Sequence, residues 1–182
     1  MNRFPDEPLR YPKADDVKRR IFRKKIARYQ RSGRPVVFID ESGFAVDQPR
    51  THGYAPRGRR CFGIRDWNAK GRINVIGALL AGSLLTVGLT DANVDADMFN
   101  LWLKQDLIPK LPPSSIIVMD NATFHKRSDT KTMIARAGHI LEYLPPYSPD
   151  LNPIEHKWAQ AKAIRRKTGK STEQIFESEL SG

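Results

Sequence analysis

Two runs of branched apolar residues, each ending in an aspartate, are the feature that most restricts the fold of this chain. One run is VVFID, which ends at Asp40, and the other is IIVMD, which ends at Asp120. Apolar runs without alternating polar residues are typical of strands buried on both faces of a sheet. A segment with helical spacing, 94–108, lies between them. The two strands can therefore lie parallel, with both carboxylates at neighbouring strand tips.

Further apolar segments predict an α/β fold with a mixed five-stranded sheet. Segments 60–67, 72–80 and 84–89 follow one another with tight connections, which indicates a three-strand meander. Another strand is expected at 139–144. Parallel strands complete the sheet, and helices flank it.

Four helices are expected around this sheet. They are a basic amphipathic helix from Asp15 to near Gly33, a helix at 94–108 that stops at Pro109, a short helix at 130–137 and a helix that begins at Pro153. Segment 41–60 is interrupted by glycines and prolines, so we expect a long protruding loop there.

The positive charge of the chain favours a polyanionic partner. The 31 Lys and Arg residues against 20 Asp and Glu give a formal net charge of +11. Most of the excess lies in segment 3–34, which has twelve basic and four acidic residues. Neutralised phosphates release condensed counterions, so nucleic acid is the leading candidate. Two alternatives stay open: the charge serves solubility, or the basic helix is a solvated helix packed by one stripe.

The composition argues against disulfide-bonded and membrane proteins. The single cysteine, Cys61, cannot form an intramolecular disulfide, which suits a reducing compartment. The N-terminal residues lack the apolar core of a signal peptide, and the longest apolar stretch is short and broken by glycines. We expect a soluble, cytoplasmic protein with no membrane partner.

A third acid, Glu155, lies in LPPYSPDLNPIEHKW (144–158), where a proline-rich loop leads into a helix. Because strand tips and a helix start can converge, Asp40, Asp120 and Glu155 are candidate metal ligands. Hard oxygen ligands suit Mg²⁺ or Mn²⁺. Three carboxylates can hold two such ions, which activate the attacking oxygen and stabilise the leaving oxygen in phosphodiester chemistry.

Each acid also has a purely structural interpretation. Asp40 can cap a turn, with Glu41 as a rival ligand, and Asp120 can form an Asx turn with Asn121. Glu155 lies three residues after Asn152 in a capping-box pattern that needs no metal.

Two neighbours of Glu155 are left out of the predicted site. Asp150 is interpreted as ordering the turn before the helix. His156 is interpreted as a surface or supporting residue, because a neutral imidazole suits zinc better than Mg²⁺.

The same motifs resemble those of the mariner superfamily of DDE transposases, and particularly its bacterial insertion-sequence members. The matching pieces are VVFIDESGF, IIVMDNATFHK and LPPYSPDLNPIEHKW, and thirty-four residues separate Asp120 from Glu155. The resemblance extends from about Asp15 to Arg166. It implies an RNase H-like fold with Asp40, Asp120 and Glu155 as the metal-binding catalytic triad.

The resemblance also implies a function. It is that of a DNA transposase catalytic domain, which uses two Mg²⁺ or Mn²⁺ ions to cleave transposon ends and transfer the strand into target DNA. The implied assembly is a homodimer, and the implied location is the bacterial cytoplasm in association with the nucleoid. Two alternatives stay open: a silent, truncated remnant that binds DNA or modulates an intact transposase, and an RNase H-like nuclease or resolvase.

DNA contacts are expected from the same comparison. The loop PRTHGYAPRG looks like one that family members extend across a dimer partner or along DNA. The contact candidates are Arg50, His52, Arg57, Arg59, Arg60 and Lys157. Asn121 and His125 closely follow the second acid and can position phosphate or water, although His125 can equally start or cap the next helix.

The expected organisation has three parts. They are a basic leader with a linker helix at 1–34, an RNase H-like catalytic domain at 35–170 and a C-terminal tail helix at 171–182. Complete relatives carry an N-terminal helix-turn-helix region that reads the terminal repeats, and this chain begins shortly before the catalytic domain. A separate helix-turn-helix chain is therefore an expected partner.

Overall fold

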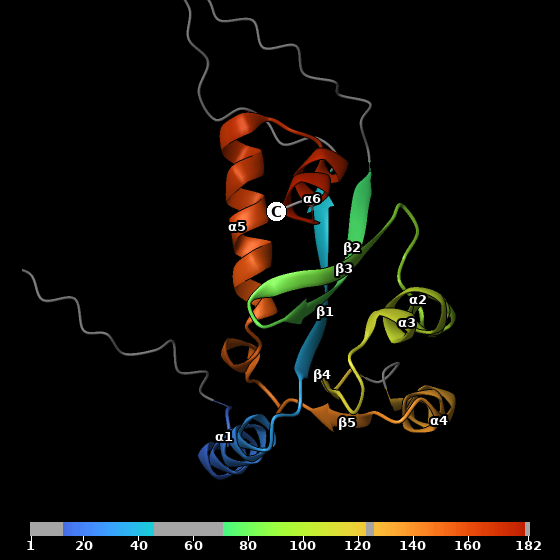
Figure 1. Ribbon diagram of the computed structural model, residues 1–182. Coiled ribbons are helices and arrows are strands. Elements are labelled where there is room, and N and C mark those ends of the chain that lie inside the picture. Colours follow the sequence, from blue (N-terminus) through green and yellow to red (C-terminus); the bar gives the residue numbers. More distant parts are fainter. Residues whose placement is uncertain (1–12, 46–70, 123–125, 181–182) are drawn as a thin grey trace, which may run out of the picture.

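The computed structural model describes residues 13–45, 71–122 and 126–180, and a sheet of five strands forms its centre (Figure 1). The strands are β1 (Val36–Ala45), β2 (Arg72–Leu80), β3 (Ser83–Thr90), β4 (Ile116–Met119) and β5 (Ile140–Tyr143). Their order is β3-β2-β1-β4-β5. The first three pair antiparallel, whereas β4 runs parallel to both β1 and β5. The predicted mixed five-stranded sheet is confirmed, but its antiparallel meander consists of β1, β2 and β3 and not of segments 60–67, 72–80 and 84–89.

Strand β1 extends further than the sequence pattern predicted. It continues five residues past Asp40, and each of its residues from Val37 to Ala45 is paired with β2. This pairing satisfies backbone groups in a segment whose composition had indicated a loop, and the buried Phe44 anchors it. The prediction that Asp40 lies at a strand tip is therefore wrong, because it lies inside β1. The expected strand at 60–67 lies outside the described residues.

The predicted basic helix is present as α1 (Asp16–Arg31). The side chain of Asp15 caps it by accepting hydrogen bonds from the backbone N–H groups of Val17 and Lys18. Phe22 and Ile26 are buried in a cluster with residues of β1 and β4. One stripe of α1 therefore packs on the sheet, and its basic residues lie mostly on the exposed side.

A continuous helical segment covers one face of the sheet. It consists of α2 (Ala96–Trp102), a π-helical turn η1 (Leu103–Leu107) and α3 (Ile108–Lys110). The segment ends at Lys110, one residue beyond Pro109, where the sequence had predicted its end. Together with α4 (Ser128–Arg136), it buries the apolar side chains that β1 directs to this face, such as Ile39.

The opposite face carries α5 (Ile154–Thr168) and α6 (Thr172–Leu180), and a single 3-10 turn, η3 (Pro149–Leu151), precedes α5. Figure 1 shows α1 and α5 on one side of the sheet and α2, α3 and α4 on the other. Trp158 and Phe176 are buried here against Phe44. Successive residues of a strand point to opposite faces, so Asp40 faces α5 while its neighbour Ile39 faces α2.

Candidate active site

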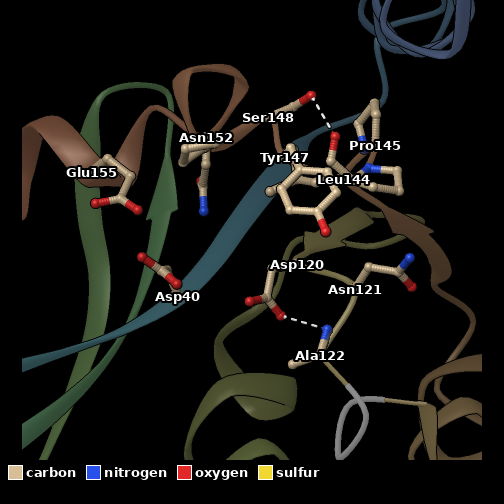
Figure 2. A pocket seen from close by; sticks show the side chains of 12 residues that line it. Asp40, Asp120, Asn121, Ala122, Leu144, Pro145, Tyr147, Ser148, Asn152 and Glu155 are labelled. Carbon is tan, nitrogen blue, oxygen red and sulfur yellow. Dashed lines mark hydrogen bonds between the residues drawn. The ribbon is translucent and has the colours of Figure 1, made fainter. Parts of the chain in front are cut away.

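All three predicted acids line one pocket of about 230 Å³. Asp40 comes from within β1, Asp120 directly follows β4, and Glu155 is in the first turn of α5. Figure 2 shows the carboxylates of Asp40 and Glu155 turned toward each other, with Asp120 across the pocket. The loop 144–149 forms the remaining wall. The parallel pairing of β1 with β4 is what brings acids eighty residues apart to one edge.

The pKa of Asp40 is raised to about 7, mainly because burial disfavours its charged form and also because the negative charge of Glu155 lies nearby. Hydrogen bonds oppose this shift: the indole Nε1 of Trp158 donates to Asp40 Oδ2 at 3.0 Å, and the backbone of Glu41 contributes as well. Negative charge is thus concentrated where the half-buried Asp40 meets the exposed Glu155.

Asp120 lies at the tip of β4, as predicted. Its Oδ1 accepts a hydrogen bond from the backbone N–H of Ala122 at 3.0 Å, which is an Asx-turn contact. The structural interpretation is thus present, and it coexists with a place in the pocket wall. The turn orients the carboxylate and also places Asn121 on the pocket lining.

The capping-box interpretation of Glu155 is wrong. Helix α5 begins without a side-chain cap, and Pro153 occupies its N-cap position. The backbone N–H of Asn152, which a capping box would present to Glu155, instead donates to the Pro149 carbonyl at 2.9 Å. The carboxylate of Glu155 is therefore turned toward Asp40 (Figure 2).

Asn152 is a pocket residue that sequence analysis identified only as a cap. Its side chain is buried, and its Oδ1 has no hydrogen-bond partner in the structure. It lines the pocket beside Glu155 (Figure 2). Trp158 was missed as well, because a tryptophan at helical spacing is more commonly a core residue. Tyr147, a loop residue with a positive φ of 54°, also lines the pocket and was not predicted as a site residue.

Among the remaining predicted site residues, Lys157 alone belongs to the part of the chain that the structure describes. His125 and the basic residues Arg50, His52, Arg57, Arg59 and Arg60 lie outside the described residues. Lys157 is half-buried on α5 but is absent from the lining. Asp150 is also outside the lining, and its partner is Arg19 of α1, with two hydrogen bonds at 2.8 and 2.6 Å. It therefore fastens α1 in addition to lying in the turn before α5.

The donor set suits a hard divalent cation. Carboxylate oxygens are the ligands that Mg²⁺ and Mn²⁺ prefer, and the raised pKa of Asp40 shows that the described neighbours leave its charge poorly compensated. Over residues 13–45, 71–122 and 126–180, however, no three His, Cys, Asp or Glu side chains are grouped closely enough to hold a metal ion. The three acids thus share one pocket without being grouped as a ready-made ligand set.

None of the helices in the described part of the chain combines the length and apolar character needed to cross a bilayer.

Comparisons with known structures agree with this architecture. The catalytic domain of Mos1 mariner transposase superimposes with a TM-score of 0.61 and 14% identity, over 98% of this chain and 86% of that one. A Mos1 transposase paired-end complex with the left transposon end superimposes with a TM-score of 0.62 and 18% identity, over 91% of this chain and 54% of that one. A mariner Mos1 paired-end complex with Mg has a TM-score of 0.63 and 19% identity, over 90% of this chain and 54% of that one. The predicted RNase H-like fold is confirmed.

This chain spans about half the length of the Mos1 chains in the paired-end complexes. None of the curated proteins compared with it matches its sequence. The family model for DDE superfamily endonucleases matches residues 35–175, a range that contains Asp40, Asp120 and Glu155. With that match over most of its length, the chain belongs to the DDE superfamily endonuclease family.

Proposed function

We propose that this chain is the catalytic domain of a DNA transposase, which cuts DNA at the ends of a transposable element and joins them to target DNA. One observation carries the proposal: three carboxylates from β1, β4 and α5 line one pocket of a DDE superfamily endonuclease. The motifs resemble those of bacterial insertion sequences, which supports action in the bacterial cytoplasm at the nucleoid. The likeness to Mos1 structures supports the same reaction class.

Asp40, Asp120 and Glu155 would hold the divalent ions, for which we propose two Mg²⁺ or Mn²⁺. Solved Mos1 complexes that carry Mg and Mn support this choice of metal. When bound, two such ions activate the attacking oxygen and stabilise the leaving oxygen of a phosphodiester. The pocket chemistry fits a cation, because a bound cation would offset the repulsion between the Asp40 and Glu155 carboxylates.

The pocket walls would help to position the DNA strand. Asp40 and Glu155 form one wall and Asp120 the other, and cations held by these carboxylates would offset their repulsion of a DNA phosphate. The loop 144–149 contains three prolines, which restrict backbone motion and keep the third wall stiff. Positioning of this kind supplies much of the rate in phosphoryl transfer, because little covalent chemistry is left for the protein.

Basic residues outside the pocket would bind the DNA backbone. On α1, the exposed side chains of Lys24, Arg28 and Arg31 line a shallow groove with Ile21. We propose that this face, the basic residues at 50–60 and Lys157 contact phosphates. Such binding is largely independent of sequence and weakens steeply as salt rises. Recognition of terminal repeats would come from a helix-turn-helix chain, and the active assembly would be a homodimer.

The test is a cleavage and joining assay. Labelled DNA that carries the element's terminal sequence is incubated with the chain, Mg²⁺ or Mn²⁺, and a helix-turn-helix chain encoded upstream. We expect metal-dependent joined products from the wild type and none from Asp120→Asn. Nicking of RNA–DNA hybrids without joining would identify a nuclease instead. Salt-sensitive DNA binding without any chemistry would identify a catalytically silent remnant.

A further inference from the structure

Helix α5 carries two residues that reach the same acid. Glu155, in its first turn, faces Asp40, and Trp158 follows three residues later on the same side of the helix. The indole of Trp158 is 2% exposed, and its Nε1 donates to Asp40 Oδ2 at 3.0 Å. The helix therefore presents both a like charge and a hydrogen-bond donor to one carboxylate.

The indole is held from two sides. Gly77 of β2 is the residue paired with Asp40 across β1 and β2, and an added Cβ at Gly77 would lie 2.5 Å from Trp158 Cη2. On the other side, the ring of Phe176 in α6 meets the indole edge-on, with centroids 5.9 Å apart and planes at 77°. Absence of a side chain at Gly77 thus lets the indole lie against the strand next to Asp40.

This support matters because the pocket acids repel each other. Asp40 and Glu155 are on different elements, and like charges at partly desolvated sites favour rotation of one side chain away from the other. A buried N–H donor to a carboxylate is a charge-assisted hydrogen bond, which is stronger than a neutral one and restricts the orientation of the acid.

We propose that Trp158 is a positioning residue that holds the Asp40 carboxylate in a preset orientation toward Glu155 for cation binding. Gly77 and Phe176 are the supports that hold the indole in place. The inference rests on the proposed metal-dependent function of the pocket. It assigns a role in the site to α6, which contributes no residue to the pocket lining.

The test replaces Trp158 by Phe, which keeps a ring in the core but removes the N–H. Trp102→Phe is the matched control, because it makes the same chemical change in the core cluster on the opposite face. Mg²⁺ and Mn²⁺ affinities are measured by titration calorimetry on each full-length variant, with melting followed by circular dichroism. Groups that orient a metal ligand typically contribute about 10- to 100-fold to affinity.

We expect Trp158→Phe to lose about tenfold or more in Mg²⁺ affinity, within that range, and Trp102→Phe to lose less than about twofold. The loss should be larger for Mg²⁺ than for Mn²⁺, because Mg²⁺ demands nearly ideal octahedral geometry. A general destabilisation would not discriminate between the two ions. Unchanged Mg²⁺ affinity in a folded Trp158→Phe variant would overturn the inference.

Gly77→Ala provides a second route if Trp158→Phe does not fold. It retains the N–H but displaces the indole, so it should weaken Mg²⁺ binding in the same direction. Wild-type affinity in this variant, with the fold intact, would also overturn the inference. If the wild-type protein binds neither ion and does not cleave DNA, the proposed function itself fails. If the wild type binds and cleaves while the variants match it, only the positioning role fails.

Discussion

Acidic side chains in two regions of this molecule meet opposite surroundings. One region, the α1 seam, consists of Arg19, Lys25 and Tyr29 of α1 with their partners Asp150 and Glu142. Arg19 pairs with Asp150, and both Lys25 and Tyr29 donate to Glu142 at 2.7 Å. The arginine lowers the pKa of Asp150. In the other region, the pocket, burial and a second acid raise the pKa of Asp40 to about 7.

The difference separates acids that hold the fold from acids that serve a site. Each seam acid has a cation within bonding distance, and the result is a helix fastened to the sheet and to the loop before α5. Asp40 instead faces Glu155, and the Trp158 indole that donates a hydrogen bond to it carries no charge. A strongly perturbed carboxyl in a cleft is a common property of functional sites. The following experiments break or sharpen this contrast.

The largest expected effect distinguishes a pocket acid from a seam acid. Asp120→Asn should lower DNA cleavage by more than about 100-fold, because direct ligands contribute more than groups that only orient them. Asp150→Asn, five residues before Glu155, should leave cleavage within about threefold, as expected of surface ion pairs that contribute little energy. Single-turnover cleavage rates measure both. Equal losses in the two variants would show that the contrast has no functional meaning.

Divalent cations should stabilise the pocket and not the seam. A ligand at a hundredfold excess over its dissociation constant adds about 2.7 kcal/mol to the free energy of unfolding. Urea denaturation with and without Mg²⁺ should show this gain in the wild type and in Asp150→Asn. Glu155→Gln should lose most of it. A gain that persists in Glu155→Gln would place the cation elsewhere.

The two regions should respond to pH in opposite directions. The unfolded chain releases the Asp40 proton near the ordinary pKa of 3.8, whereas the folded protein retains it up to about pH 7. Stability should therefore fall as pH rises through this window, by on the order of 2 kcal/mol after allowance for partial solvent access. Asp40→Asn should remove this decline in metal-free urea denaturation at pH 5 and pH 8.

Asp150 supplies the matched comparison. Its pKa is lowered in the folded protein, so its contribution is present above the ordinary value of 3.8 and is lost as pH falls through the lowered value. Asp150→Asn should consequently leave the decline between pH 5 and pH 8 intact. A pH dependence between pH 5 and pH 8 that is the same in Asp40→Asn as in the wild type would contradict the raised pKa of Asp40.

The smallest expected effect concerns the seam itself. Arg19→Met should cost about 1 kcal/mol of unfolding free energy, since a partly shielded bidentate pair lies at the upper end of surface ion pairs. A double-mutant cycle with Asp150→Asn, followed by thermal melting, isolates the pair energy. Additive losses would mean that the two side chains do not interact in solution.

Much of the architecture followed from local patterns. Apolar runs predicted the strands that became β1 and β4, and their parallel pairing followed from the helix between them. The acids were recognisable because each occurs in a motif with restricted neighbours, such as the prolines before Glu155. Segment 41–45 was misjudged because glycine and charge lower strand propensity, while pairing with β2 overrides that preference.

The sequence by itself determined the order of strands and helices, the charge of the chain and the three acids that meet at one pocket. Only the tertiary structure decided that Asp40 lies within β1, that Asp150 pairs with Arg19, and that Trp158, packed against Gly77, donates to Asp40. The two side-chain contacts join residues far apart in the chain, 131 positions for Arg19 and Asp150 and 118 positions for Trp158 and Asp40. Local propensity carries no information about such partners, because their energies arise from desolvation and packing that exist only after the chain has folded.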